Sequence, residues 1–153
     1  MDFFELIRTG DLEGVKQAVA SDPALLNGRD SRGFPPLVLA SYNERNEITQ
    51  FLLEAGADVN AQDAAGNTAL MGVCFKGYVD IASLLVAQGA DVNIQNANGA
   101  TALIYTATFG QNEIATLLLA HGADKKQADH RGLNAQDHAR MQGAPGMVEL
   151  LAD

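Results

Sequence analysis

The sequence has little of what would mark a secreted, disulfide-linked or membrane-inserted protein. Its one cysteine, Cys74, excludes an internal disulfide. No apolar stretch is long enough to span a membrane, and the residues from Met1 to Glu5 lack the basic start and the apolar core of a signal peptide. We therefore expect a cytoplasmic protein that does not enter a membrane.

Basic residues are also scarce. The chain has 10 Lys and Arg residues against 19 Asp and Glu, which gives a net charge of -9. The few basic residues are scattered and form no stripe that could follow a phosphate backbone, so nucleic acid is not an expected partner. A length of 153 residues with 47% hydrophobic content is enough for one domain with a sizeable core.

Residues in catalytic arrangements are equally sparse. The sequence contains no G-x-S-x-G turn, no glycine-rich phosphate-binding loop and no cluster of Cys and His. Its histidines, His121, His130 and His138, lie nine and eight residues apart, so no two have the four-residue spacing of a metal-binding helical pair. We expect no enzyme activity, no catalytic residue, no cofactor and no metal site. Cys74 is expected to be a small buried apolar residue.

What the sequence does have is one pattern that returns at a fixed interval. Gly33, Gly66, Gly99 and Gly132 are each 33 residues apart. The same interval relates two further series, Leu37, Leu70 and Leu103, and Gly56, Gly89 and Gly122. A period of this length is typical of proteins built from stacked units.

The residues of one unit predict a first helix with defined ends. In the central copy, Thr68 is placed to cap a helix over Ala69–Lys76, and Gly77 is placed to end it. The inward face of this helix is expected to hold Leu70, Val73 and Cys74.

A second helix and a hairpin complete the unit. Apolar residues at i, i+3 and i+4 predict an amphipathic helix that runs to Gln88, where Gly89 supplies a left-handed C-terminal residue. Its inward face is expected to hold Ile81, Leu84 and Leu85. Asn and Gly in Asn96–Gly99 favour a tight hairpin turn. The fold class expected is therefore all-α with β-hairpin loops.

Several short motifs resemble one known family. They are T-A-L-M at Thr68–Met71, T-A-L-I at Thr101–Ile104, and G-A-D-V-N at Gly56–Asn60 and again at Gly89–Asn93. Together with the 33-residue period, they resemble ankyrin repeats. The resemblance covers nearly the whole chain and implies a solenoid of five stacked helix pairs. The family's usual His is replaced by Val38, Met71 and Ile104, which substitutes apolar packing for a hydrogen bond between helices.

The period divides the chain into a single domain of five units. We expect an N-terminal cap at 1–29, full repeats at 30–62, 63–95 and 96–128, and a C-terminal cap at 129–153. The second unit departs from the pattern, with Pro35 at the capping position and Glu44 where Gly77 stands. In the last unit Gln136 and Arg140 replace apolar residues, while Met147, Leu150 and Leu151 are expected to face inward. Polar caps at both ends predict a monomer.

An acidic residue repeats in the turn after each second helix, at Asp58, Asp91 and Asp124. Equivalent residues of neighbouring units lie roughly 8 to 10 Å apart, too far for a carboxylate pair that would do acid–base chemistry. We expect each to accept local hydrogen bonds that shape its own turn.

The resemblance also implies where a partner would bind, because hairpin tips and exposed sides of first helices form the concave surface that grips proteins in this family. Counting along the repeats places small residues there, Ser31, Ala64, Ala65, Gly72, Ala97 and Ala100. The larger residues, which are the candidate partner-binding set, are Arg32, Phe34, Leu39, Tyr42, Asn43, Asn67, Phe75, Lys76, Asn98, Tyr105, Thr108 and Phe109.

Five of the chain's nine aromatic residues belong to this set. A contiguous strip of exposed aromatics marks an interface, whereas the same rings inserted between helices would only be packing. Two hypotheses follow. The chain is a non-enzymatic module that binds one protein partner through this surface, or it is an accessory subunit, such as a protector or immunity partner, that modulates a separate enzyme or toxin. An enzyme in its own right is the third class, and no residue pattern supports it.

Overall fold

The computed structural model describes residues 1–153, which form ten α-helices and one 3₁₀ helix, with no β-strand. None of the helices has the length and apolar character needed to cross a membrane. In chain order the elements are α1 (Phe3–Thr9), α2 (Leu12–Ser21), η1 (Pro23–Asn27), α3 (Pro36–Tyr42), α4 (Asn46–Glu54), α5 (Ala69–Lys76), α6 (Val79–Ala87), α7 (Ala102–Phe109), α8 (Asn112–Ala120), α9 (Ala135–Met141) and α10 (Pro145–Leu150).

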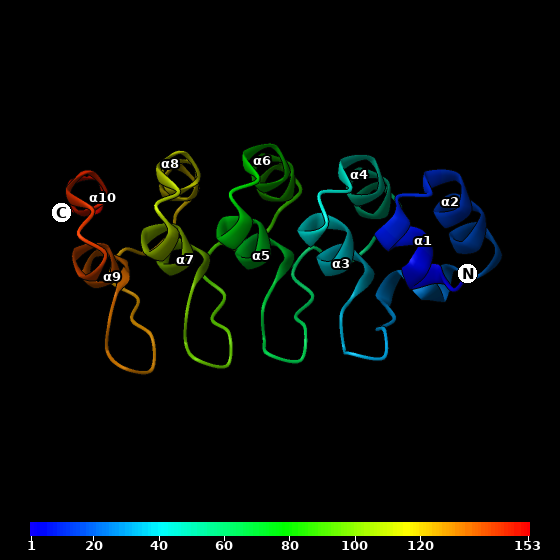
Figure 1. Ribbon diagram of the computed structural model, residues 1–153, viewed down its shortest axis with the longest axis horizontal. Coiled ribbons are helices and arrows are strands. Elements are labelled where there is room, and N and C mark those ends of the chain that lie inside the picture. Colours follow the sequence, from blue (N-terminus) through cyan, green and yellow to red (C-terminus); the bar gives the residue numbers. More distant parts are fainter.

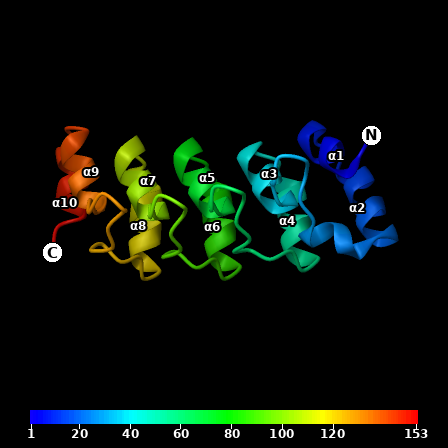
Figure 2. The same ribbon diagram turned by 90° about the horizontal axis from the view of Figure 1, so that it is seen from below.

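These helices form five pairs in a row, with the two ends of the chain at opposite ends of the row (Figure 1). The first helices of the pairs, α1, α3, α5, α7 and α9, make one layer and the second helices make the other (Figures 1 and 2). Long loops between the pairs all project to one side (Figure 1). Neighbouring first helices pack on each other and one core runs through the row, which confirms the predicted solenoid.

The helix ends follow from the residues that the sequence places there. The Thr68 hydroxyl accepts the N–H of Met71 at 3.2 Å, as predicted, and the Thr101 hydroxyl does the same for α7. Gly77 ends α5 in the left-handed region, with φ of 82°. The second unit has neither the capping threonine nor the terminating glycine. Pro35 makes no side-chain capping bond, and Glu44, with φ of 56°, is the one non-glycine residue with positive φ.

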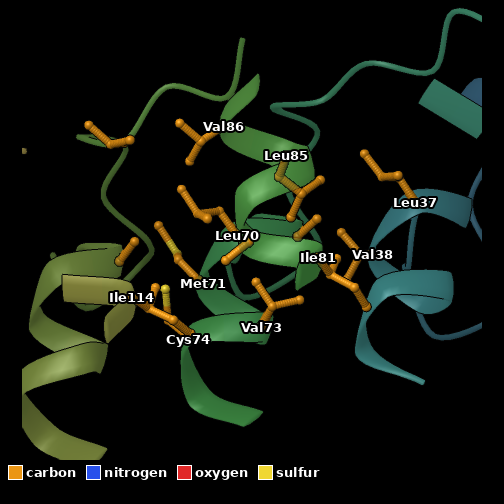
Figure 3. Close-up of a cluster of buried hydrophobic side chains, with 14 of the residues drawn as sticks. Leu37, Val38, Leu70, Met71, Val73, Cys74, Ile81, Leu85, Val86 and Ile114 are labelled. Carbon is orange, nitrogen blue, oxygen red and sulfur yellow. The ribbon is translucent and has the colours of Figure 1, made fainter. Parts of the chain in front are cut away.

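The core lies between the two layers. Leu70, Val73 and Cys74 of α5 are at most 1% exposed, so the predicted inward face of the first helix is confirmed. Figure 3 shows Leu70 and Val73 on the side of Ile81 and Leu85 from α6, and Cys74 beside Ile114 from α8. Burying such apolar surface is the main favourable term in folding, at about 25 cal/mol per Å².

The predicted inward face of the second helix is wrong at one residue. Ile81 and Leu85 are 2% and 0% exposed, but Leu84 is only half-buried, and Ala82 and Val86 complete the buried face instead. The second helices pack against their own first helix and against neighbouring second helices, so the i, i+4 positions point inward. The i+3 position lies at the solvent edge. Phe51 and Leu117 are half-buried in the same way.

Each loop is a tight hairpin turn without a strand. In the third unit the N–H of Gly66 donates to the carbonyl of Asp63, and the N–H of Asp63 donates to the carbonyl of Asn67, both at 2.9 Å. One carboxylate oxygen of Asp63, Oδ1, also accepts the N–H groups of Ala65 and Asn67, both at 2.9 Å. Asp30, Asn96 and Asp129 do the same in their own units.

The predicted role of the other repeated acidic residue is confirmed. Asp58, Asp91 and Asp124 each accept, at 2.9 Å, the N–H of the residue two places along the chain. The adjacent turn is tied to the next unit, because the Asn60 amide oxygen accepts the N–H of Asp91 at 2.8 Å and Asn93 accepts that of Asp124 at 2.8 Å. The loops are therefore held in register along the row.

The end units depart from the sequence-based expectation in two details. The link between α2 and the second unit contains η1, a turn of 3₁₀ helix begun by Asp22, whose side chain accepts the N–H of Ala24 at 3.2 Å. In the last unit Met147 and Leu151 are buried, as predicted, but Leu150 is only half-buried. Gln136 donates to the carbonyl of Val148 at 3.0 Å, and Arg140 is exposed.

Candidate protein-binding groove

A hollow of about 590 Å³ lies between the first helices α3, α5 and α7 and the hairpins of the second and third units. Nine of its 14 lining residues are hydrophobic, and we call it the aromatic groove. Another hollow, of about 620 Å³, lies beside α1 and has only three hydrophobic residues among nine. Eight of the predicted partner-binding residues line the aromatic groove, Arg32, Phe34, Leu39, Tyr42, Asn67, Phe75, Tyr105 and Phe109.

The aromatic rings of this groove form a continuous row. Tyr42 and Phe75 stack with ring centroids 6.3 Å apart and planes at 5°, since they occupy the same position of successive repeats. Phe109 comes one residue later in its helix and meets Phe75 edge-on, at 4.8 Å and 89°. Tyr105 then stacks on Phe109 at 6.3 Å and 15°. These four side chains are therefore neighbours along one strip.

The rings differ in how much of them reaches solvent. Tyr42, Phe75 and Phe109 are 41%, 41% and 45% exposed, which is unusual for side chains of this size. Phe34 and Tyr105 are half-buried and pack against the core. The groove therefore contains three rings available for contact and two that also serve as packing.

Polar contacts fix Tyr105 in place. Its hydroxyl lies 3.2 Å from the Asn96 amide nitrogen and 3.4 Å from the Asn67 amide oxygen. Burial raises the pKa of Tyr105, and the negative charge of Asp63 raises it further, against the opposing hydrogen bond from Asn96. Tyr105 therefore stays protonated and donates a hydrogen bond inside the groove.

Four predicted residues lie outside the groove lining, and one inside it is not exposed. Leu39 is only 6% exposed, so its side chain belongs to the core and does not stand on the surface. The Thr108 hydroxyl donates to the carbonyl of Ile104 at 2.9 Å and is half-buried. Asn43, Lys76 and Asn98 are exposed around the rim.

The hollow exists because one first helix has no side chain where the others do. Leu39, Gly72, Tyr105 and His138 stand at the same position of successive repeats. A Cβ atom at Gly72 would meet the Tyr42 ring at 3.3 Å. Counting along the repeats placed Gly72 on this surface but did not identify it as a gap. Comparing it with its three counterparts would have done so.

The groove residues not in the candidate set are Val38, Thr68 and Met71 on the floor, Asp63 and Ala65 in the hairpin, and Gly72 itself. Of these, Asp63 is the charged residue, and it places a carboxylate in the groove lining beside the rings. Asp63 was not predicted for this surface, since an acidic residue in a turn commonly serves the turn itself, as its hydrogen bonds to Ala65 and Asn67 do here.

Cys74 and His138, which have reactive side chains, have structural roles outside the groove. Cys74 is fully buried, and burial strongly raises the pKa of its thiol, so it behaves as an apolar side chain, as predicted. His138 lies 2.8 Å from the second carboxylate oxygen of Asp129. Burial would raise the pKa of Asp129, but the hydrogen bonds from His138 and from the backbone of Leu133 and Arg131 outweigh it and lower that pKa.

Comparisons with known proteins agree with the geometry. The pattern that defines ankyrin repeats, in three copies, matches residues 3–96 and again residues 70–153. A comparison with curated proteins found no similar sequence. The helix pairs, the hairpins and this match along nearly the whole length lead to one conclusion: the chain belongs to the ankyrin repeat family.

Proposed function

We propose that this chain is a non-enzymatic binding module that holds one protein partner in the aromatic groove. Ankyrin repeats are generally protein–protein interaction modules. The observation that supports this use of the groove is a row of three exposed rings beside a hollow of about 590 Å³, in which Phe75 lies between Tyr42 and Phe109 and contacts both.

Exposed rings of this kind favour binding for a physical reason. Each leaves a large apolar area in water, and a partner that covers it gains about 25 cal/mol per Å². Aromatic side chains also lose little conformational entropy on binding, which makes them frequent hot spots at interfaces. The rings stand on helices with buried inner faces, so the surface that they form is preorganised.

The charge of the molecule gives a further expectation. With a net charge of -9, the chain attracts partners whose binding surface has a basic rim around an apolar centre. Added salt should then slow association more than it speeds release. We also propose that the chain acts in the cytoplasm as a monomer.

Affinity capture from the source cell tests the proposal. The bait is the wild-type chain, and the comparison baits are the double variant Phe75→Ala/Phe109→Ala and the control Phe51→Ala. Phe51 is half-buried on α4, outside the groove, and the Lys16 ammonium lies 6.0 Å from the centre of its ring. A partner retained by wild type and Phe51→Ala but lost from the double variant is the expected result. Equal capture by all three baits would contradict the proposal.

The same capture addresses the accessory-subunit hypothesis. If the retained partner is an enzyme or a toxin, its activity is measured with and without the chain. A change that the Phe75→Ala/Phe109→Ala variant fails to produce would assign the regulation to the aromatic groove. An unchanged activity would leave binding alone as the function of the groove.

A further inference from the structure

The four hairpins carry an Asp or Asn at one position, and three of these side chains use both of their terminal atoms. In each hairpin, Oδ1 accepts two backbone N–H groups. The second atom of Asp129 bonds His138 at 2.8 Å, and that of Asn96 lies 3.2 Å from the Tyr105 hydroxyl. The second oxygen of Asp30 lies 3.8 Å from the Arg8 guanidinium.

Asp63 is the exception. Its second carboxylate oxygen has neither a hydrogen-bond nor an ion-pair partner in the protein. The reason lies in α5: the residue that would reach it, as His138 and Tyr105 do in their own units, is Gly72. The same missing side chain opens the groove, and Asp63 forms part of the groove lining. Asp63, with its free carboxylate oxygen, therefore lines a hollow whose lining also includes five aromatic residues.

We propose that the aromatic groove takes an arginine side chain of the partner protein, with its guanidinium on Asp63 and its stem against the rings of Phe75, Tyr105 and Phe109. The inference rests on the proposed function and adds the chemistry of the group that is bound. A guanidinium is planar and weakly hydrated, so it stacks on aromatic faces and donates to a carboxylate at the same time. An uncharged side chain would cover the rings but leave the carboxylate without a partner.

Two of the chain's own cations lie at the groove, and one of them, Arg32, belongs to its lining. The Arg32 guanidinium stands over the Phe34 ring at 5.2 Å, and the Lys76 ammonium stands over the Tyr42 ring at 4.9 Å. Neither makes an ion pair with Asp63. Both are exposed, so salt screens their repulsion of an incoming arginine, and removing Arg32 should strengthen binding slightly.

A titration with small probes tests the inference without the partner. Nα-acetyl-arginine amide, Nα-acetyl-lysine amide and Nα-acetyl-norleucine amide are added to the ¹⁵N-labelled chain, and amide shifts are followed by NMR. The arginine probe is expected to shift Gly72 and its groove neighbours saturably, more tightly than either other probe. Norleucine has the same backbone and an uncharged chain, so it measures apolar contact alone.

Two variants assign the probe to this site. Asp63→Asn should weaken the arginine probe about tenfold, the scale of one hydrogen bond to a charged group. The turn should survive, because Asn96 makes the same backbone contacts in the next unit. Asp129→Asn is the matched control, since it removes an equal charge at the equivalent position and should leave probe binding unchanged. Gly72→Leu, which copies Leu39, should abolish binding by filling the hollow.

Three results would overturn the inference: norleucine or lysine binding as tightly as arginine, an Asp63→Asn variant that binds like wild type, or no saturable shift. None of them removes the proposed function, which depends on partner capture by Phe75 and Phe109. Conversely, arginine binding that depends on Asp63 would stand even if the double-phenylalanine bait still captured its partner. The two claims can therefore fail separately.

Discussion

The two faces of the helix row expose different kinds of side chain. On the face of the second helices, the exposed positions of α6 are Asp80, Ser83 and Ala87. On the face of the first helices they include Tyr42, Phe75 and Phe109. Folding alone requires only that the inner sides be apolar, and it leaves the outer sides free to be polar. Folding alone therefore does not account for the exposed aromatic face, whereas the proposed partner binding would.

The exposed apolar residues follow the repeat. Of the five large hydrophobic residues exposed in the chain, three are these rings, and a fourth is Met141, at 58%. Met141 stands 66 residues, or two repeats, after Phe75. Only Met1, at the N-terminus, falls outside the pattern. The apolar exposure is thus confined to one position, or its neighbour, on successive first helices.

The largest effect is expected on the second-helix side. Leu85→Ala should cost about 2 to 5 kcal/mol of the free energy of unfolding, because it leaves a cavity in the layer shared by adjacent pairs. Leu84→Ala should cost about 1 kcal/mol, since its half-buried side chain leaves no enclosed cavity. Chemical denaturation measures both. Equal losses would mean that the inward face of α6 is assigned wrongly.

A smaller effect is expected in the turn that joins the two layers. Glu44→Gly should stabilise the chain by up to about 1 kcal/mol. A residue with a Cβ atom is strained at the positive φ of this position, and glycine is not. Glu44→Ala is the matched control and should give no gain, since it keeps the Cβ atom. The melting temperatures decide the matter, and partner binding should be the same in both variants. A glycine variant that melts earlier than wild type would contradict this account of the turn.

The smallest effect concerns two hairpin aspartates. The second carboxylate oxygen of Asp129 is bonded to His138, whereas that of Asp63 has no partner. The folded-state pKa of Asp129 lies below its ordinary value. Its ionised form therefore stabilises the fold above pH of about 4, and this contribution is lost as the pH falls further toward the folded-state pKa. Urea midpoints measured down to pH 3 should fall less for Asp129→Asn than for wild type. Asp63→Asn should follow wild type, and an Asp129→Asn curve parallel to wild type would refute the role of the pair.

Monomeric behaviour is a separate expectation of the capped row. Sedimentation should give one species at every concentration, because the last pair exposes Arg140 and offers no continuous apolar edge. A dimer that persists on dilution and disappears in a variant of α9 or α10 would show that this end of the row is an interface.

Much of the fold could be predicted because its signals are local. The 33-residue period, the capping Thr68 and the left-handed Gly77 each act within a few residues, so the sequence alone located α5 to the residue. Leu84 was misplaced because the width of a buried helix face depends on how many neighbours the helix has. The 3₁₀ helix η1 was missed because its short link has no periodic pattern.

The site could be predicted only in part, for a related reason. The positions of the exposed rings follow from the repeat, and three of the five aromatics predicted for this surface are exposed. The burial of Leu39 depends on the residues of neighbouring helices that cover it, which the pattern within one repeat does not show. The free oxygen of Asp63 depends on a side chain that is absent at Gly72, and an absence becomes visible only when equivalent positions are compared in space.

The measurement that tests the central claim most directly compares stability and binding in the same variants. Phe75→Ala and Phe109→Ala should each lower the free energy of unfolding by only about 1 kcal/mol, the scale of the lost ring–ring contact. Each should weaken binding to the captured partner by about 2 kcal/mol, the scale of an interface hot spot. If instead both variants lose about 3 to 5 kcal/mol of stability, as buried phenylalanines do, while their folded fraction binds the partner normally, the rings are core and the aromatic groove is not the binding site.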